Sequence, residues 1–92
     1  MFRLNTAIKT PHIILYTKTG CPWGKQVIDF LNYKQIPFEE RNMTENDAYR
    51  LEAIDKSGQW KCPTLDIEGH MLADSDAKQI ESYLLSIGVL AV

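Results

Sequence analysis

Cys21, in the stretch TKTGCPWGKQ (residues 17–26), is the residue whose type and surroundings suggest chemistry. A cysteine thiolate is a nucleophile, and both a helix N-terminus and a nearby cation lower the thiol pKa because each favours the charged form. Pro22 suits the first position of a helix, and Lys18 lies three residues before the cysteine. We therefore predict a helix that begins at Cys21 and a thiolate stabilised by that helix and by Lys18. Gly24 stands where a Cys-x-x-Cys dithiol motif would hold its second cysteine.

The length and composition are those of one small globular domain. Ninety-two residues can form a core but leave little stability to spare, and 45% hydrophobic with 24% charged residues is ordinary for a globule. We expect a single domain over residues 1–92, with residues 1–11 as a short N-terminal extension. The net charge of -2 with interspersed signs offers no basic stripe, so nucleic acid is not expected as a partner.

The sequence also predicts a location. No apolar run approaches a membrane span, and the N-terminal MFRLNTAIKTPHIILY lacks the uninterrupted apolar region and small-residue cleavage site of a signal peptide. Two cysteines are too few for the disulfide framework of a small secreted domain. We therefore expect a cytoplasmic protein with no membrane partner. His12 and His70 have no partner at ligand spacing, so no metal site is expected.

The elements around Cys21 follow from the apolar pattern. The continuous apolar run at residues 12–16 is typical of a strand covered on both faces. Residues 22–33 carry apolar side chains at helical spacing and are expected to form the first helix. A second short strand is predicted at residues 38–42. The apolar residues of the helix are Trp23, Val27, Phe30 and Leu31.

A second helix is expected after residue 44, because Thr44 and Asp47 form a capping-box-like start and Gly58 stands at its end. Its apolar side chains are Ala48, Leu51 and Ile54.

The C-terminal third of the chain predicts a hairpin and a last helix. Residues 63–67 and 70–73 are short strands around the two-residue turn Glu68–Gly69. Ser75 is expected to cap the helix that follows, and Gly88 to end it. The residues of this helix expected to face the core are Ile80, Tyr83, Leu84 and Ile87.

The predicted order of elements is β-α-β-α-β-β-α. Alternation of strand and helix at the start implies that the first two strands pair in parallel through a right-handed crossover, and the hairpin adds an antiparallel pair. We therefore predict an α/β fold, a four-stranded mixed sheet with three helices on its faces.

Three stretches, YTKTGCPWG, GQWKCP and IEGHMLADSD, stand at the spacing of the motifs of one family. With the element order, they resemble the glutaredoxin family of the thioredoxin fold over nearly the whole chain. Glutaredoxins carry Gly-Gln-x-Thr-Val-Pro where this chain has residues 58–63, and Gly-Gly-Ser-Asp where it has residues 73–76. The sequence resembles a monothiol-type member whose active-site motif is the variant Cys-Pro-Trp-Gly.

The resemblance implies a glutathione site. In glutaredoxins a lysine at the position of Lys18 holds a carboxylate of glutathione, and a glutamine at the position of Gln59 helps to bind the glycyl carboxylate. The residue before a cis-proline, here Cys62 before Pro63, offers its backbone to the cysteinyl part of glutathione. Trp23 replaces the usual Tyr or Phe and is expected to shield Cys21 at the rim of the site.

The other end of the implied glutathione site departs from the family. Ser75 and Asp76 match the pair that meets the γ-glutamyl group at a helix N-terminus, although both residues also suit plain N-capping. Ala73 and Asp74 replace the family's Gly-Gly, so that Asp74 puts an extra negative charge beside a site for an anion. Lys61, in place of Thr, would offset that charge. We expect glutathione binding to be weaker or altered in preference.

The resemblance implies a glutathione-dependent thiol-disulfide oxidoreductase that reduces protein–glutathione mixed disulfides by a monothiol mechanism through Cys21. Its partners would be glutathione and glutathionylated or disulfide-containing proteins, and we expect a monomer. An alternative is a carrier of a [2Fe–2S] cluster held between two chains by Cys21 and two glutathiones. Monothiol glutaredoxins with Cys-Gly-Phe-Ser do this, and Gly24 removes the same cysteine.

Cys62 is open to two interpretations, because the resemblance puts it before a cis-proline that faces Cys21, where the family usually has Val. It either fills the same pocket as a small apolar side chain, as free cysteines often do, or acts as a resolving thiol for Cys21. A disulfide needs Cα atoms about 4.4–6.8 Å apart, which two loops that converge on one site could provide. The second interpretation would restore the dithiol cycle that Gly24 otherwise removes.

Overall fold

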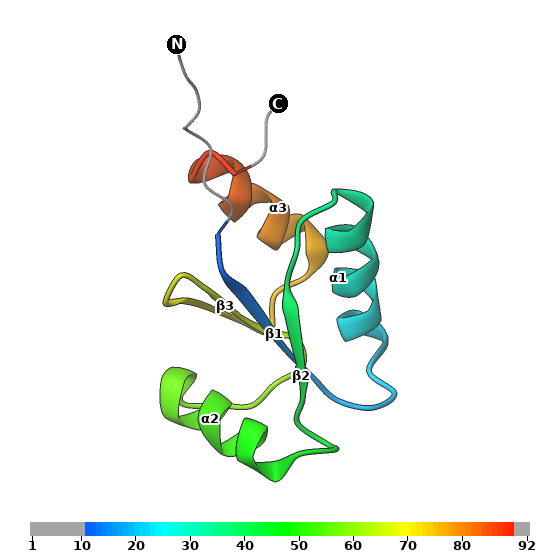
Figure 1. Ribbon diagram of the computed structural model, residues 1–92, viewed down its shortest axis with the longest axis vertical. Helices are drawn as coiled ribbons and strands as arrows, with labels where there is room; N and C mark the ends of the chain where they lie inside the picture. Colours follow the sequence, from blue (N-terminus) through cyan, green and yellow to red (C-terminus); the bar gives the residue numbers. More distant parts are fainter. Residues whose placement is uncertain (1–10, 90–92) are drawn as a thin grey trace.

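A computed structural model describes residues 11–89, and its elements follow the order β-α-β-α-β-β-α (Figure 1). The predicted α/β fold, a four-stranded mixed sheet with three helices, is confirmed. Residues 1–10 of the predicted N-terminal extension lie outside the described residues. The elements are β1 (Ile13–Thr17), α1 (Pro22–Tyr33), β2 (Glu39–Asn42), α2 (Asp47–Ser57), β3 (Thr64–Ile67), β4 (His70–Ala73) and α3 (Ala77–Ser86). None of these helices is long and apolar enough to cross a membrane.

The sheet places the end of β1 beside the start of β3. Its strand order is β2-β1-β3-β4, with β1 parallel to β2 and antiparallel to β3. All five residues of β1 are buried, as predicted for a strand covered on both faces. Tyr16 lies opposite Thr64 in the antiparallel pair. The chain that leaves β1 toward Cys21 and the chain that enters β3 from Pro63 therefore meet at the same edge of the sheet.

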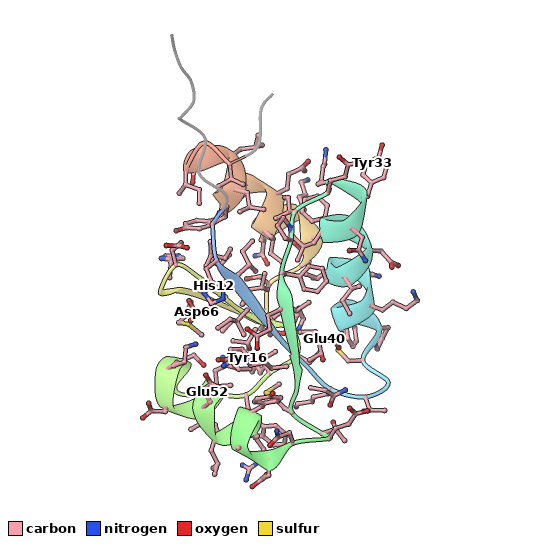
Figure 2. All side chains as sticks on the ribbon, in the orientation of Figure 1. His12, Tyr16, Tyr33, Glu40, Glu52 and Asp66 are labelled. Carbon is pink, nitrogen blue, oxygen red and sulfur yellow. The ribbon has the colours of Figure 1, made fainter. Side chains whose placement is uncertain are left out.

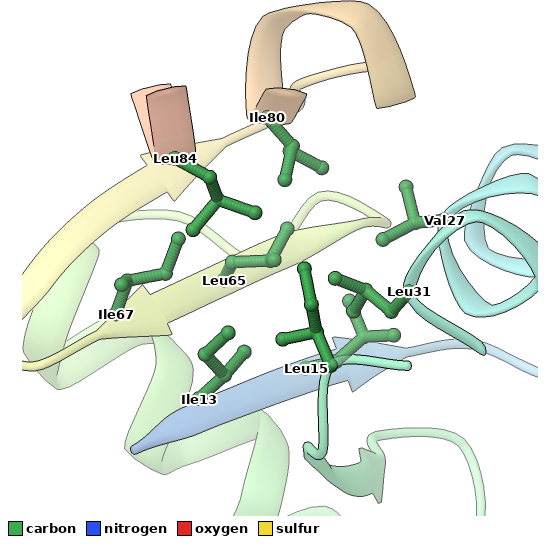
Figure 3. Close-up of a cluster of buried hydrophobic side chains, with 9 residues drawn as sticks. Ile13, Leu15, Val27, Leu31, Leu65, Ile67, Ile80 and Leu84 are labelled. Atoms are coloured by element: carbon green, nitrogen blue, oxygen red, sulfur yellow. The ribbon is translucent and has the colours of Figure 1, made fainter. Parts of the chain in front are cut away.

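One face of the sheet is covered by α1 and α3, whose apolar side chains point toward those of β1 and β3 (Figure 3). Val27 and Leu31 are four residues apart on α1, as are Ile80 and Leu84 on α3, so each pair lies on one side of its helix. Burial of each such side chain contributes roughly 1.5–3 kcal/mol to folding. The strand residues of this core are Ile13, Leu15, Leu65 and Ile67.

The opposite face of the sheet is covered by α2 and holds a smaller core with a polar cluster. Lys56 of α2 donates a hydrogen bond to the Tyr16 hydroxyl at 2.8 Å and forms an ion pair with Asp66 of β3. Figure 2 shows Tyr16 and Asp66 on the sheet side of this interface and Glu52 on the helix side. Because Lys56 of α2 contacts a residue of β1 and a residue of β3, these polar contacts hold α2 against the sheet. The apolar residues are Ile14, Tyr16, Met43 and Ala53.

The predicted end of α2 at Gly58 and the predicted turn at Glu68–Gly69 are confirmed, and both contain a glycine with a positive φ. Gly58 ends α2 with a φ of 79°, and its N–H bonds to the carbonyl of Ile54 at 2.7 Å. Glu68 and Gly69, with φ values of 52° and 88°, form the two-residue turn between β3 and β4. Two successive positive φ values match the twist of the flanking strands.

Two predicted helix caps are wrong. Asn46 caps α2, since its side chain accepts a hydrogen bond from a first-turn N–H at 3.0 Å, whereas the Thr44 hydroxyl accepts from an N–H in the loop before α1. Asp76 rather than Ser75 caps α3. Several cap-forming residues stand in a row before each helix, and the tertiary path of the preceding loop decides which of them caps it.

Leu51, an apolar residue of the predicted second helix, and Ile87, which was predicted to face the core, are both exposed. Leu51 is 55% exposed because Tyr49 and Ala53, four residues apart, form the face of α2 that packs on the sheet, and Leu51 lies midway between them on the opposite side. Ile87 is 44% exposed because α3 ends at Ser86 and Ile87 is its C-cap.

Candidate active site

Cys21 is the N-cap residue of α1. Its sulfur accepts a hydrogen bond from the backbone N–H of Gly24 at 3.3 Å, and Pro22 occupies the first helical position, as predicted. Gly20, with a φ of 80°, makes the turn by which the chain leaves β1 and enters the helix. The first turn of α1 contains no acidic residue. The sulfur is therefore placed where a helix N-terminus accepts negative charge, without a competing carboxylate.

Cys62 brings a second sulfur to the same place. Gly24 is buried, and a Cβ atom at this residue would lie 2.9 Å from the Cys62 sulfur and 3.6 Å from the Cys21 sulfur. The Cys21 thiol also donates to the carbonyl oxygen of Cys62 at 3.7 Å. The Cys62–Pro63 peptide bond is cis, as the resemblance implied. The two free cysteines, 41 positions apart in sequence, are neighbours at the start of α1.

The surroundings of Cys62 keep its thiol protonated. Burial raises the pKa of the Cys62 thiol to about 12, and its hydrogen bond with Cys21 adds to the rise, while the backbone N–H of Lys18 acts in the opposite direction. At neutral pH Cys62 is therefore a neutral thiol and a poor nucleophile.

Lys18 contributes to the site with its backbone and rests its side chain on Trp60. The Lys18 ammonium lies 3.8 Å from the centre of the Trp60 ring, and the Arg50 guanidinium lies 5.4 Å from the same centre. Cation–π contacts at exposed positions contribute about 0.5–1 kcal/mol. A carboxylate that binds the Lys18 ammonium would therefore compete with this ring. Trp23, on the first turn of α1, is 59% exposed at the rim beside Cys21.

The N-terminus of α3 forms the opposite wall and is closed by a capping box. The Asp76 Oδ1 accepts a hydrogen bond from the Gln79 N–H at 2.8 Å, and the Gln79 side-chain oxygen accepts from the Asp76 N–H at 3.0 Å. Ser75, just before the cap, is buried. Plain capping, which the sequence left open for this pair, thus holds for Asp76.

Asp74 carries its negative charge beside this wall. It adopts a φ of 55°, in the left-handed region where the family's glycine would be unstrained. Its carboxylate lies 3.7 Å from the Lys61 ammonium, and both side chains are more than half exposed. Lys61 therefore offsets the charge of Asp74, as expected from the sequence, through an exposed ion pair.

A groove of about 670 Å³ lies beside Cys21, between the loops that precede α1, β3 and α3. Every predicted site residue except Gln59 lines it. The Gln59 amide instead donates to the hydroxyls of Ser57 at 2.8 Å and Thr64 at 3.2 Å, which ties down the loop before β3. The predicted residues in the groove are Lys18, Cys21, Trp23, Cys62, Pro63, Ser75 and Asp76.

Sequence reasoning missed two features of the groove. Gln79 also lines it, and the spacing Asp-x-x-Gln of a capping box was its available signal. The burial of Gly24 against the Cys62 sulfur had no local signal, because the two residues come from loops far apart in sequence.

Within residues 11–89, no group of three or more His, Cys, Asp or Glu side chains is placed to hold a metal ion. A [2Fe–2S] cluster needs four ligands, so this chain would supply Cys21 and depend on a second copy and glutathione for the rest. The cluster carrier stays a prediction, which anaerobic reconstitution followed by visible absorption and sizing would test.

The fold and the place of the thiol define a class of protein. The four-stranded mixed sheet lies between α2 on one face and the α1–α3 pair on the other, and a cysteine at the start of α1 lies beside a cis-proline. This arrangement defines a thioredoxin-like protein with a thiol site. The family model for glutaredoxin matches residues 13–72, so the chain belongs to the glutaredoxin family. Membership of this family supports a thiol redox function.

Individual relatives agree with the family. The chain is 26% identical over 72 residues to a glutaredoxin-like 8.6 kDa protein in the rubredoxin operon of Clostridium pasteurianum, over 78% of this chain and 96% of that protein. The thioredoxin-like protein BC3987 superposes with a TM-score of 0.71 at 24% identity, over 76% of this chain and 96% of that chain. A glutaredoxin from Archaeoglobus fulgidus gives a TM-score of 0.68 at 16% identity, over 87% and 94%. At these identities the two structures support the fold alone.

Proposed function

We propose that the chain is a glutathione-dependent thiol-disulfide oxidoreductase that reduces mixed disulfides between proteins and glutathione, with Cys21 as the nucleophile. The observation that carries this proposal is the Cys21 sulfur at the N-terminus of α1, hydrogen-bonded to the Gly24 N–H and open to a groove large enough for a peptide ligand. The reaction consumes glutathione, which suits the reducing cytoplasm expected from the sequence.

The reaction consists of two thiol–disulfide exchanges. The Cys21 thiolate attacks the glutathione sulfur of the mixed disulfide, so that a Cys21–glutathione bond forms and the protein thiolate leaves and takes up a proton. A second glutathione thiolate then attacks the glutathione sulfur of that adduct, glutathione disulfide departs, and the Cys21 thiolate is regenerated. The Gly24 N–H stabilises Cys21 each time it carries negative charge.

The groove offers a place for each part of glutathione. The backbone of Cys62, whose carbonyl faces the Cys21 sulfur, would pair with the cysteinyl part as a neighbouring strand does. The γ-glutamyl end would then reach Ser75 and Asp76 at the start of α3, where the second carboxylate oxygen of Asp76 suits an ammonium. Lys18 would supply positive charge for a carboxylate at the other end.

The test is turnover of cysteinyl–glutathione disulfide with glutathione as the reductant. Wild type should turn over and Cys21→Ser should not, because a serine hydroxyl is far less nucleophilic than a thiolate. The matched control replaces glutathione with 2-mercaptoethanol at equal thiolate concentration, which should slow the reaction. Equal rates with the two thiols would contradict glutathione dependence, and unchanged turnover in Cys21→Ser would contradict the nucleophile.

A further inference from the structure

We propose that Cys62 is the resolving thiol of Cys21, so that the chain also reduces protein disulfides through an intramolecular Cys21–Cys62 disulfide. This inference deepens the proposed function and rests on it in one respect, that Cys21 is the nucleophile. The observation behind it is that the sulfurs of two free cysteines lie next to the same residue, Gly24, in the first turn of α1.

The position of Gly24 shows how close the two sulfurs are. Both sulfurs lie within 3.6 Å of the position that a Cβ atom at residue 24 would occupy, and the Cys62 sulfur is the nearer at 2.9 Å. In a Cys-x-x-Cys motif the side chain of the second cysteine begins at this position. The Cys62 sulfur therefore reaches from the loop before β3 into the space that the second thiol of a dithiol motif would use. The absence of a side chain at Gly24 is what leaves room for it.

The neighbours of Cys62 distinguish it from an apolar side chain that fills a pocket. Its sulfur lies beside Gly24 in the first turn of α1, where the Cys21 sulfur also lies, and its carbonyl oxygen accepts from the Cys21 thiol at 3.7 Å. It belongs to neither of the two buried hydrophobic clusters, and it lines the same groove as Cys21. A side chain retained only for its volume would be expected among hydrophobic residues.

The two thiols differ in a way that sets the order of events. Burial raises the pKa of the Cys62 thiol to about 12, so that Cys62 does not compete for the substrate at neutral pH. Cys21, at the helix N-terminus, attacks first. Once Cys21 is in a mixed disulfide, Cys62 is the nearest thiol, and proximity compensates for its small thiolate fraction.

The proposed cycle transfers two electrons from the pair of cysteines to the substrate disulfide. The Cys21 thiolate attacks one sulfur of a protein disulfide, forming a Cys21–protein bond and releasing one protein thiolate. The Cys62 thiol then loses its proton and attacks the Cys21 sulfur, forming Cys21–Cys62 and releasing the second protein thiolate, which takes up a proton. The substrate gains the two electrons that the pair of cysteines loses. Of the two protons that the substrate thiolates take up, one comes from the Cys62 thiol and the other from solvent, which received it when the Cys21 thiolate formed. Two glutathione molecules reduce Cys21–Cys62 and leave as glutathione disulfide.

The first test is the mass and thiol content of the intact chain after oxidation by glutathione disulfide. Wild type should lose both free thiols and two hydrogen atoms of mass without a glutathione adduct, whereas Cys62→Ser should accumulate glutathione on Cys21. An equally abundant Cys21 adduct in wild type, with Cys62 open to alkylation after unfolding, would overturn the resolving role and leave the proposed function intact. If wild type takes up no glutathione and forms no disulfide, the proposed function itself fails.

A second variant guards against misfolding of Cys62→Ser. Cys62→Ala combined with Gly24→Cys moves the resolving thiol to the fourth position of a Cys-x-x-Cys motif and frees the space that its side chain needs. With insulin as substrate and glutathione as reductant, Cys62→Ala should lose disulfide reduction and the double variant should regain it. Equal insulin reduction by wild type and Cys62→Ala would overturn the inference.

Discussion

The N-termini of α1 and α3 face the same groove but are built differently. The start of α1 is capped by the thiol of Cys21 through one long contact of 3.3 Å, with no acidic residue in the first turn. The start of α3 is capped by the Asp76 carboxylate in a reciprocal box with contacts of 2.8 and 3.0 Å. Both caps satisfy the same kind of helix N–H, but a thiol can also form a disulfide bond, whereas a carboxylate acts only through hydrogen bonds and charge.

Within one groove, the cap of α1 therefore matters mainly for reactivity and the cap of α3 mainly for the stability of its helix. A thiol is a weak hydrogen-bond acceptor, so α1 gains little from its cap, and the sulfur remains available for reaction. The carboxylate cap is worth about 1 kcal/mol to its helix and is engaged by it. Substitutions at the two ends should therefore affect different measurements.

The largest expected effect is at Cys21. Cys21→Ser should remove turnover by several orders of magnitude while changing the free energy of unfolding by less than about 0.5 kcal/mol, because serine is a good N-cap. Urea unfolding alongside the activity assay measures both. A loss of stability as large as that of Asp76→Ala would contradict the assignment of α1 as the weakly capped end.

Gly24→Ala should destabilise the fold by about 1–3 kcal/mol, since the new Cβ would lie 2.9 Å from the Cys62 sulfur. In a Cys62→Ala background the same change should be neutral or stabilising, because the space is free and alanine favours a helix over glycine by up to about 1 kcal/mol. Urea unfolding of the four variants forms a double-mutant cycle. Equal effects of Gly24→Ala in both backgrounds would show that the two positions do not compete for space.

Asp76→Ala should cost about 1 kcal/mol of stability through loss of the α3 cap, whereas Asp76→Asn should cost only a few tenths because the acceptor oxygen is kept. Thermal or urea unfolding measures the difference between the two. If both variants are equally stable, the capping box does not hold α3.

Asp74 adds a second carboxylate near the Asp76 cap at the α3 end. Asp74→Asn should tighten glutathione binding a few-fold, corresponding to about 0.2–1 kcal/mol for an exposed charge. Asparagine tolerates the observed φ of 55°, so the loop should be unchanged. Binding should improve more at low salt than at high salt. Weaker binding in the variant would show that the carboxylate takes part in recognition.

The last expected effect appears only at alkaline pH and belongs to the α1 end. The pKa of the Cys62 thiol is raised from 9.0 to about 12 by burial, so the unfolded chain releases this proton first. The resulting stabilisation is fully present below pH 9 and is lost as the pH rises toward 12. Cys62→Ser does not titrate in this range, and wild type should lose stability more steeply than this control above pH 9. Parallel slopes for the two proteins would contradict the burial of Cys62.

The element order, the helix that begins at Pro22 and most of the residues that line the groove were predictable from the amino-acid sequence. These follow from local signals: the apolar run of β1, helical spacing in α1, and the Glu68–Gly69 turn. The motif resemblance added the cis bond before Pro63, because it depends on a proline whose position is visible in the sequence.

Which of several neighbouring polar residues caps a helix or bonds within its loop became clear only from the tertiary structure. It selected Asn46 and Asp76 as caps and engaged Gln59 within its own loop. It also set the relation between Gly24 and Cys62, because the register of β1 against β3 brings their loops to one edge of the sheet. Local patterns fix which conformations a segment prefers, whereas contacts between segments far apart in sequence depend on strand register and loop path, which no short stretch encodes.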